Sequence, residues 1–280
     1  METQPYHERI TDGKFRSAVD LLDAGDADGL KVYLTQNPEL VYQRILFDEE
    51  GYFKNPGLLE FVAENPVRHD RLPENIVEVA RVILEAGAKN NADQIDYTLG
   101  LVCSGRVPRE FKVQIPLIDL LCSYGANPDG AMTAALAHGE FEAVESMIAK
   151  GAVIDLPAAA ATGRTNFVAK LIPLSDSRQK HLALAFAAQH GHAAALKFLL
   201  DAGLDPSLYN PEGAHMFSTP LHQAIISGHE NCVRLLVEAG ARLDLKDTIY
   251  HGTALDWAMY FENTAIISYL RSQGAKPGDE

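Results

Sequence analysis

One pattern returns along this chain: two apolar residues, a short spacer, and then a glycine followed by alanine or leucine. The glycines that close it are Gly87, Gly125, Gly151, Gly203, Gly240 and Gly274. A period in the twenties to forties is typical of a stacked array of small supersecondary units. Because each unit in such an array packs on its neighbours, the pattern predicts a solenoid without one central core.

The clearest unit runs from Ser218 to Leu245 and is interpreted as two helices. Thr219 suits a helix N-cap, and Pro220 suits the first turn, where its missing N–H is not needed. Gly228 and Gly240 suit the left-handed residues that end the first and the second helix. The apolar residues between them recur at helical spacing.

The opening of this unit, Thr219-Pro220-Leu221-His222 followed by Ala224, resembles that of the ankyrin repeat. The resemblance implies an all-α ankyrin-repeat solenoid of about eight helix-turn-helix units. It also implies that His222 makes local hydrogen bonds and ties neighbouring units together. The style of the repeats around residues 26–41 is similar to that of bacterial ankyrin proteins.

The repeat register predicts a single solenoid over residues 1–280. It consists of an N-terminal extension, a capping unit, a unit with insertions, five further units and a C-terminal cap. The expected ranges are 1–12, 13–46, 47–92, 93–128, 129–154, 155–180, 181–217, 218–250 and 251–280. In the capping unit, we expect a helix ending near Gly25 and a second helix from Asp26 to Gln36.

The spacing of the closing glycines changes along the chain. Gly203 and Gly240 are 37 residues apart, and Gly240 and Gly274 are 34 apart, close to the roughly 33 of an ankyrin repeat. Gly125 and Gly151 are only 26 apart, and Gly151 and Gly203 are 52 apart, twice that value. The central units therefore lack the residues for a protruding β-turn finger.

The composition limits the classes of function. The chain has 24 Lys and Arg against 38 Asp and Glu, a net charge of −14, whereas nucleic-acid binding needs a basic footprint. This charge would attract a basic partner. No apolar run is long enough to span a membrane, and residues 1–5 lack the pattern of a secretory signal. Three cysteines, far apart on expected helices, indicate reduced thiols, so we expect a cytoplasmic protein without membrane contact.

No catalytic or metal-binding pattern is present. The sequence contains no P-loop, no G-x-S-x-G and no Cys-x2-Cys. His190 and His192 flank Gly191 at an expected helix end, so their rings would diverge. We therefore expect no enzymatic activity, no metal and no cofactor.

In the resembled fold, the concave face is lined by the fingers and by the ends of the first helices. The register places six residues at those helix ends: Glu64, His138, His190, Ser227, Tyr260 and Phe261. The fingers would add Tyr52, Phe53, Tyr209, Met216, Phe217 and Tyr250. Exposed aromatic and methionine side chains anchor interfaces, so these twelve residues predict a groove for a protein or peptide. The alternative is that each aromatic packs against its own helix.

Two insertions, residues 45–56 and 65–75, support a different hypothesis. Arg68, His69, Asp70 and Arg71, with Glu64, supply charges of both signs near Tyr52 and Phe53. Such a mixture can hold a small zwitterionic or anionic ligand, with or without catalysis, in a pocket between the insertions. It can equally form a salt-bridged loop. A third hypothesis is that the chain is one arm of a larger assembly.

Overall fold

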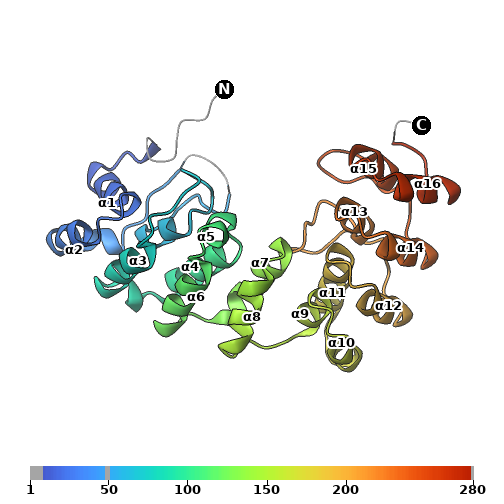
Figure 1. Ribbon diagram of the computed structural model, residues 1–280, viewed down its shortest axis with the longest axis horizontal. Helices are drawn as coiled ribbons and strands as arrows, with labels where there is room; N and C mark the ends of the chain where they lie inside the picture. The colour runs from blue at the N-terminus through green and yellow to red at the C-terminus, as the bar shows by residue number, and fades with distance from the viewer. Residues whose placement is uncertain (1–8, 48–50, 279–280) are drawn as a thin grey trace. The chain divides into compact units, whose positions relative to one another are not determined.

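The computed structural model describes residues 9–47 and 51–278. Within these ranges the protein is all-α, and its helices form eight consecutive antiparallel pairs (Figure 1). The backbone pairing of Arg44 with Gly57 is an isolated antiparallel bridge. The chain divides into two compact units, Met1–Ala152 and Val153–Glu280, which are described in turn. None of the helices in the described part is long and apolar enough to cross a bilayer.

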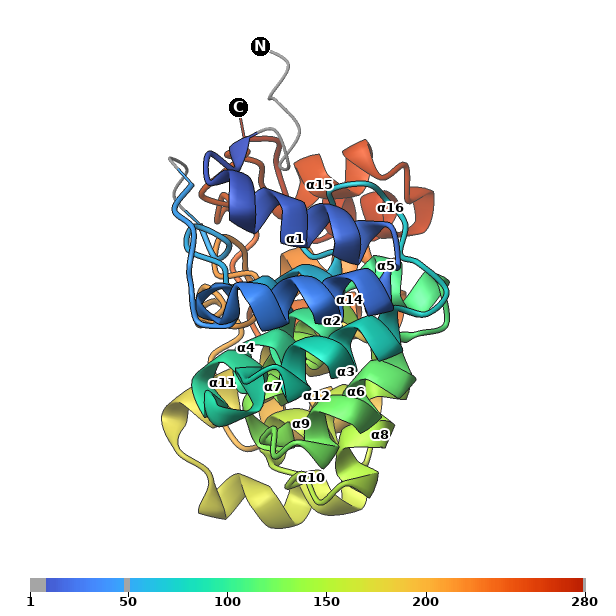
Figure 2. The same ribbon diagram turned by 90° about the vertical axis from the view of Figure 1, so that its left-hand side faces the viewer.

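The N-terminal unit contains four helix pairs, α1/α2, η3/α3, α4/α6 and α7/α8, with short helices between them. Their bounds are α1 Gly13–Asp23, α2 Ala27–Gln36, η2 Pro38–Val41, η3 Leu58–Ala63, α3 Ile76–Glu85, η4 Ala88–Asn90, α4 Ala92–Cys103, α5 Arg106–Glu110, α6 Gln114–Ser123, α7 Pro128–His138 and α8 Phe141–Ala149. The first helices α1, η3, α4 and α7 contact one another in that order, as do α2, α3, α6 and α8. Figure 2 shows α1, α2 and α3 following one another at the N-terminal end of this unit.

The C-terminal unit also contains four pairs: α9/α10, α11/α12, α13/α14 and α15/α16. Their bounds are α9 Leu156–Ala161, α10 Thr165–Leu171, η5 Ile172–Leu174, α11 Ser177–Gln189, α12 Ala193–Asp201, α13 Pro220–Ile226, α14 Glu230–Glu238, α15 Ala254–Tyr260 and α16 Thr264–Ser272. Again each first helix packs on the next first helix, and each second helix on the next second helix. The four alanines of α9 are fully buried, which lets α9 and α11 approach closely.

The local signals expected from the sequence form the helix ends. Asp26 caps α2, and its Oδ1 accepts from the Gly29 N–H at 2.8 Å. Thr219 precedes α13 with Pro220 in the first turn. Gly228 and Gly240 adopt φ of 71° and 90°, the left-handed conformation that glycine takes without strain.

The lengths of the connections confirm the expectation of short central units. Only residues 150–155 join α8 to α9, and η5 with residues 175–176 joins α10 to α11. By contrast, residues 202–219 and 239–253 form long finger loops before α13 and α15. Residues 104–113, which join α4 to α6, contain α5.

The first insertion is folded onto the protein in its described part. Ile45 N–H donates to the Pro56 carbonyl at 3.1 Å, and Phe47 N–H to the Lys54 carbonyl at 2.8 Å. The ring of Phe53 stacks with Phe47 at 6.3 Å and meets Phe61 edge-on at 5.3 Å between centroids. Phe53 is therefore buried, and its predicted place on an exposed finger is wrong. Three phenylalanines bury more apolar area together than one exposed ring could.

The second insertion folds around Glu64, which ends η3 in a left-handed conformation with φ of 46°. The Glu64 carboxylate accepts backbone N–H groups from Arg68 at 2.7 Å, from Asp70 at 3.0 Å and from His69. It also forms an ion pair with the Arg68 guanidinium at 3.0 Å. Glu64 is buried by these contacts. Its predicted exposure at the end of a first helix is therefore wrong.

Candidate protein-binding surface

Histidines join consecutive helix pairs in the C-terminal unit. His222 Nδ1 accepts from the Thr219 N–H at 3.3 Å and lies 2.8 Å from Thr219 Oγ1. That leaves the proton on Nε2, which donates to the Gly252 carbonyl at 3.2 Å in the next finger. A ring nitrogen of His192 donates a hydrogen bond in the other direction along the array, to the Ala161 carbonyl of the preceding pair. The expected role of His222 as a tie between units is confirmed.

A buried aspartate holds the finger before α15. Asp247 accepts N–H groups from Ile249 at 2.9 Å, Tyr250 at 2.6 Å and Gly252 at 2.9 Å. It also accepts from the indole Nε1 of Trp257 at 2.9 Å. Burial alone would raise the pKa of Asp247, but the donated hydrogen bonds outweigh it and lower that pKa. The ionised carboxylate therefore fixes the backbone that carries Ile249 and Tyr250.

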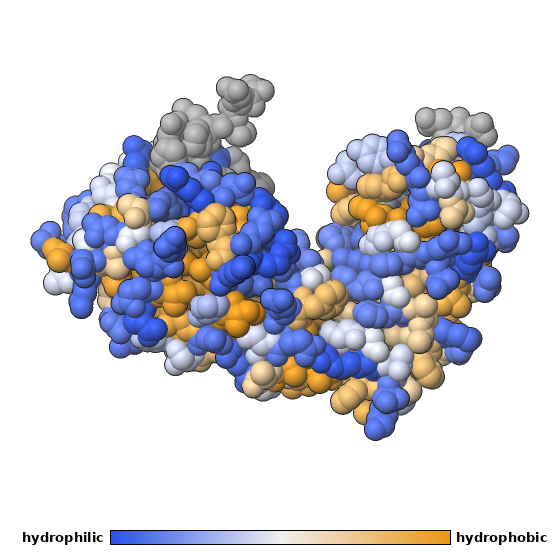
Figure 3. Space-filling view, viewed as in Figure 1, coloured by the Kyte–Doolittle hydropathy of each residue, from blue (hydrophilic) through white to orange (hydrophobic). Residues whose placement is uncertain are grey.

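Five aromatic side chains from this finger, its neighbour and α15 form a continuous row. We call Phe217, Tyr250, Trp257, Tyr260 and Phe261 the aromatic row. Phe217 lies 6.4 Å from Tyr250 and 6.3 Å from Trp257, centroid to centroid. Phe261 lies 6.2 Å from Trp257 and 5.1 Å from Tyr260. Hydrophobic residues gather over this part of the molecule, around α13 and α15, in Figure 3.

The outer members of the aromatic row are exposed to solvent. Tyr260 exposes 81% of its surface, Tyr250 exposes 74%, and Met216, beside Phe217, exposes 62%. Trp257 is buried and Phe217 is half-buried beneath them. The row therefore has a packed base and exposed rings, which is how interface anchors are held rigid before binding.

The remaining predicted residues of the C-terminal unit lie nearby in sequence but make different contacts. The Tyr209 hydroxyl donates to the Lys246 carbonyl at 2.6 Å and so joins the two fingers. Ser227 is exposed directly after α13. The His190 ring is half-buried, 6.1 Å from Phe186. The structure thus brings together Phe217, Tyr250, Tyr260 and Phe261.

Two residues at this surface, Trp257 in the row and His215 beside it, are not among the residues predicted from the sequence. The His215 ring lies 6.1 Å from that of Phe217, centroid to centroid. The signal for Trp257 was its position at the centre of the last first helix, four residues before Phe261. Two residues four positions apart lie on the same face of a helix.

In the N-terminal unit, the predicted residues do not form a comparable cluster. Tyr52 is exposed, and its hydroxyl donates to Asn65 Oδ1 at 3.0 Å. His138 is exposed at the end of α7. Phe53 and Glu64 are buried, as described above.

Two charged or polar side chains of the second insertion, Arg68 and His69, contact Asp23 of α1. The Arg68 guanidinium binds both oxygens of Asp23, at 2.7 and 2.9 Å, and lies 4.9 Å above the Phe61 ring. His69 Nε2 lies 3.2 Å from Asp23 Oδ2. A cavity of about 300 Å³ beside them is lined by Asp20, Asp23, Ala24, His69 and Arg71. It lies between α1 and residues 65–75, and its lining includes no residue of the first insertion.

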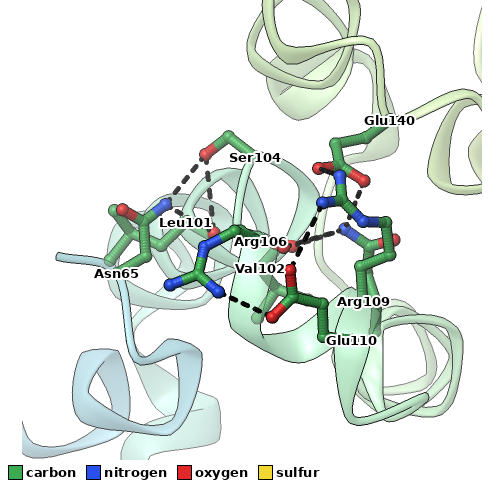
Figure 4. A network of polar contacts seen from close by, with 10 residues as sticks. Asn65, Leu101, Val102, Ser104, Arg106, Arg109, Glu110 and Glu140 are labelled. Carbon is green, nitrogen blue, oxygen red and sulfur yellow. Dashed lines mark hydrogen bonds and ion pairs between the residues drawn. The ribbon is translucent and has the colours of Figure 1, made fainter. Parts of the chain in front are cut away.

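A second polar network holds α5 in place (Figure 4). Arg109 forms an ion pair with Glu140, and Gln114 Nε2 donates to the Val102 carbonyl at 3.1 Å. Arg106 binds Glu110 and Asp70, both at 2.6 Å. Glu140 occupies the position that histidine takes in the later Gly-His pairs, and here it pairs with Arg109 of α5. These side chains attach α5 to the neighbouring helices.

The thiols are protonated at neutral pH. Burial raises the pKa of Cys103 far above its usual range and that of Cys232 to about 11. Because the thiolate is the nucleophilic form, these two side chains are poor nucleophiles. Residues 9–47 and 51–278 contain no group of three or more His, Cys, Asp or Glu arranged to hold a metal ion.

In a comparison with known protein families, residues 184–280 match the family described as "Ankyrin repeats (3 copies)". Over 106 residues the chain is 36% identical to "Ankyrin repeat and SAM domain-containing protein 6" of Mus musculus, and 34% identical to the Rattus norvegicus protein of that name. Over 93 residues it is 30% identical to "Putative E3 ubiquitin-protein ligase XBAT31" of Arabidopsis thaliana.

These matches cover 37% of this chain and 11% of each rodent protein, and 33% of this chain and 20% of the Arabidopsis protein. The chain therefore spans only a small part of the length of these relatives. The similarity therefore indicates the repeat and the way it packs.

Proposed function

Because the chain is an ankyrin repeat protein, we propose that it binds a protein or peptide partner through the aromatic row and the adjoining finger residue Met216, without catalysing a reaction. Ankyrin repeats are in general protein–protein interaction modules. The observation that carries the proposal is the row itself: exposed rings of Tyr250 and Tyr260 rest on the packed rings of Phe217 and Trp257. Large rigid aromatics of this kind supply most of the binding energy in interfaces.

The charge distribution supports a basic partner and is part of the proposal. Residues 1–152 contain 25 Asp and Glu against 14 Lys and Arg, whereas residues 153–280 contain 13 against 10. Most of the net charge of −14 therefore belongs to the N-terminal unit. That unit would attract basic segments and repel nucleic acids and anionic membranes. A cytoplasmic setting fits three unpaired cysteines.

The ligase activity in the name of the Arabidopsis relative is not proposed for this chain. The match covers 20% of that protein.

A triple variant, Tyr250→Ser, Tyr260→Ser and Phe261→Ser, tests the proposal. Phe217 is left intact because it packs on Trp257 and its loss would disturb the fold. Anchors of this type contribute about 2 kcal/mol or more each, so partners captured by the wild-type protein from host lysate should be lost with the variant. Capture followed by mass spectrometry gives the readout.

The matched control is Phe167→Ser with Phe198→Ser. These rings are 46% and 45% exposed on α10 and α12, second helices of the same unit. The control should retain the partners. If the triple variant captures the same partners as the wild-type protein, the aromatic row is not the interface.

A further inference from the structure

A buried negative charge lies beneath the aromatic row. Asp247 is only 1% exposed, and the hydrogen bonds described above keep it ionised. Its donors are three backbone N–H groups and the Trp257 indole, none of them a cation. In residues 9–47 and 51–278, Asp247 forms no ion pair with a lysine or arginine. Its charge therefore extends to the rings that lie above it.

The cations of the same finger are engaged elsewhere. The Arg242 guanidinium binds both oxygens of Asp244, at 2.8 and 3.1 Å. Lys246 Nζ donates to the Gly278 carbonyl, near the end of the described chain. The finger thus leaves the charge of Asp247 uncompensated.

A second carboxylate follows the other end of the row. Glu262 comes directly after Phe261 and is exposed, and it has no ion pair within the part of the chain that the structure describes. Its backbone adopts φ of 55°, a conformation that strains a residue with a Cβ. Strained residues are frequent at functional sites, because they persist where their side chain is needed. Both ends of the row are therefore negative.

The rings between these two charges are suited to a cation. The Trp257 Nε1–H bond to Asp247 Oδ2, at 2.9 Å, polarises the indole and makes its π face more negative. The exposed faces of Tyr250 and Tyr260 attract cations in the same way. Among protein cations, the guanidinium of arginine is planar and weakly hydrated, stacks on aromatic rings and binds carboxylates through paired hydrogen bonds.

From this arrangement we propose that the partner of the aromatic row presents an arginine, whose guanidinium stacks on the exposed rings and binds the Glu262 carboxylate. Asp247 acts through its field and needs no contact with the ligand. Glu262 is open to direct contact. This inference rests on the function proposed for the row and adds the chemistry of the partner.

An array of random twelve-residue peptides tests the inference. It is probed with the full wild-type chain and with the triple variant of Tyr250, Tyr260 and Phe261. Peptides bound only by the wild type are synthesised again with each arginine replaced by citrulline, which keeps the shape without the charge, or by lysine. Fluorescence anisotropy of the labelled peptides measures Kd. Citrulline should weaken binding about fivefold or more, because stacking and ion pairing both lose the charge. Lysine should bind between the two.

Glu262→Gln removes the carboxylate and keeps the length of the side chain. It should weaken binding of the arginine peptides about fivefold and leave binding of the citrulline peptides unchanged. The matched control is Glu238→Gln, an exposed carboxylate at the end of the second helix α14. It changes the net charge equally and should bind as the wild type does. Circular dichroism checks that both variants keep the fold.

Failure of the proposed function and failure of this inference give different results. If no peptide depends on the row, the function proposed for the row is contradicted, and this inference with it. Peptides that depend on the row but lack arginine overturn the inference alone. So does equal binding of the arginine peptides and their citrulline or lysine versions. Unchanged binding in Glu262→Gln, or an equal loss in Glu238→Gln, also overturns it.

Discussion

At the scale of single residues, His222 shows how a repeat motif becomes a structural contact. Its neutral ring accepts from Thr219 and donates to the Gly252 carbonyl, so it needs one proton and one free lone pair. Burial lowers the pKa of His222, while the Gly252 bond and the charge of Asp247 partly oppose that shift. A second proton would remove the acceptor and break the bond to Thr219.

The stability of the protein should therefore depend on pH through His222. A histidine with a lowered folded-state pKa contributes fully above its unfolded pKa of about 6.5, and the contribution is lost as pH falls below that value. We expect the free energy of unfolding of the wild-type protein to fall between pH 7 and pH 5. In His222→Gln, this fall should be smaller. Urea unfolding at several pH values measures both.

The difference between the two proteins is the informative quantity, since other groups titrate in the same range. Burial lowers the pKa of His181 and His192 as well, whereas burial raises that of Glu60 to about 6, with the opposite effect on stability. Parallel pH profiles for wild type and variant would contradict the role given to His222.

At the scale of an element, the turn inside each helix pair that has no insertion contains one left-handed residue. Gly228 supplies it between α13 and α14, with φ of 71°. In the last pair, Glu262 adopts φ of 55° at the equivalent position, between α15 and α16. A residue with a Cβ pays roughly 1–2 kcal/mol for this conformation, and glycine does not. The sequence of the last unit therefore departs from the repeat at an energetic cost.

Replacing Glu262 by glycine should stabilise the protein by about 1 kcal/mol, because the left-handed strain disappears. The matched change, Gly228→Ala, should destabilise by a similar amount. A Cβ at Gly228 would come no closer than 3.7 Å to Asn263 Nδ2, so the cost there is conformational and not a clash. Thermal unfolding of the two variants beside the wild-type protein gives the comparison. Equal melting temperatures for all three would show that the turn does not limit stability.

At the scale of the molecule, each helix pair packs on its neighbouring pairs within each of the two compact units. In such an array, stability is approximately a sum of contributions from each unit and from its contacts with the neighbouring units. A destabilising substitution therefore affects its own unit and the adjacent units more than distant ones. The chain has one tryptophan, Trp257, in the last pair. Its fluorescence reports the C-terminal repeats, while circular dichroism reports all helices.

Phe53→Ala should separate these two signals. Phe53 packs with Phe47 and Phe61 in the N-terminal unit, and loss of a buried phenylalanine costs about 3–5 kcal/mol. We expect the urea midpoint from circular dichroism to fall clearly and the midpoint from Trp257 fluorescence to move by less than half as much. The exposed neighbour Tyr52→Ala serves as the control and should change both midpoints little. Equal shifts of both signals in Phe53→Ala would mean that the chain unfolds as one cooperative body.

The part of the proposed binding surface that could be predicted came from the repeat register. Because the finger and the end of the first helix recur in each unit, the register indicated Phe217, Tyr250, Tyr260 and Phe261 as neighbours of one face, and the structure brings their rings together. The same rule was wrong for Phe53 and Glu64, which lie in the unit interrupted by insertions. There the first helix is the 3-10 helix η3, and the inserted segments cover it.

The sequence by itself determined the units, their helices and the ties between them, because caps, left-handed glycines and His222 act within a few residues or one repeat. The tertiary structure decided which aromatic and charged side chains are available. The burial of a side chain depends on what its insertion folds against. Phe53 packs against two phenylalanine rings, and Arg68 forms ion pairs with Asp23 and Glu64. The tertiary structure also formed a cavity lined by His181 and Leu208, since α11 and the finger before α13 meet there from positions at least 19 residues apart.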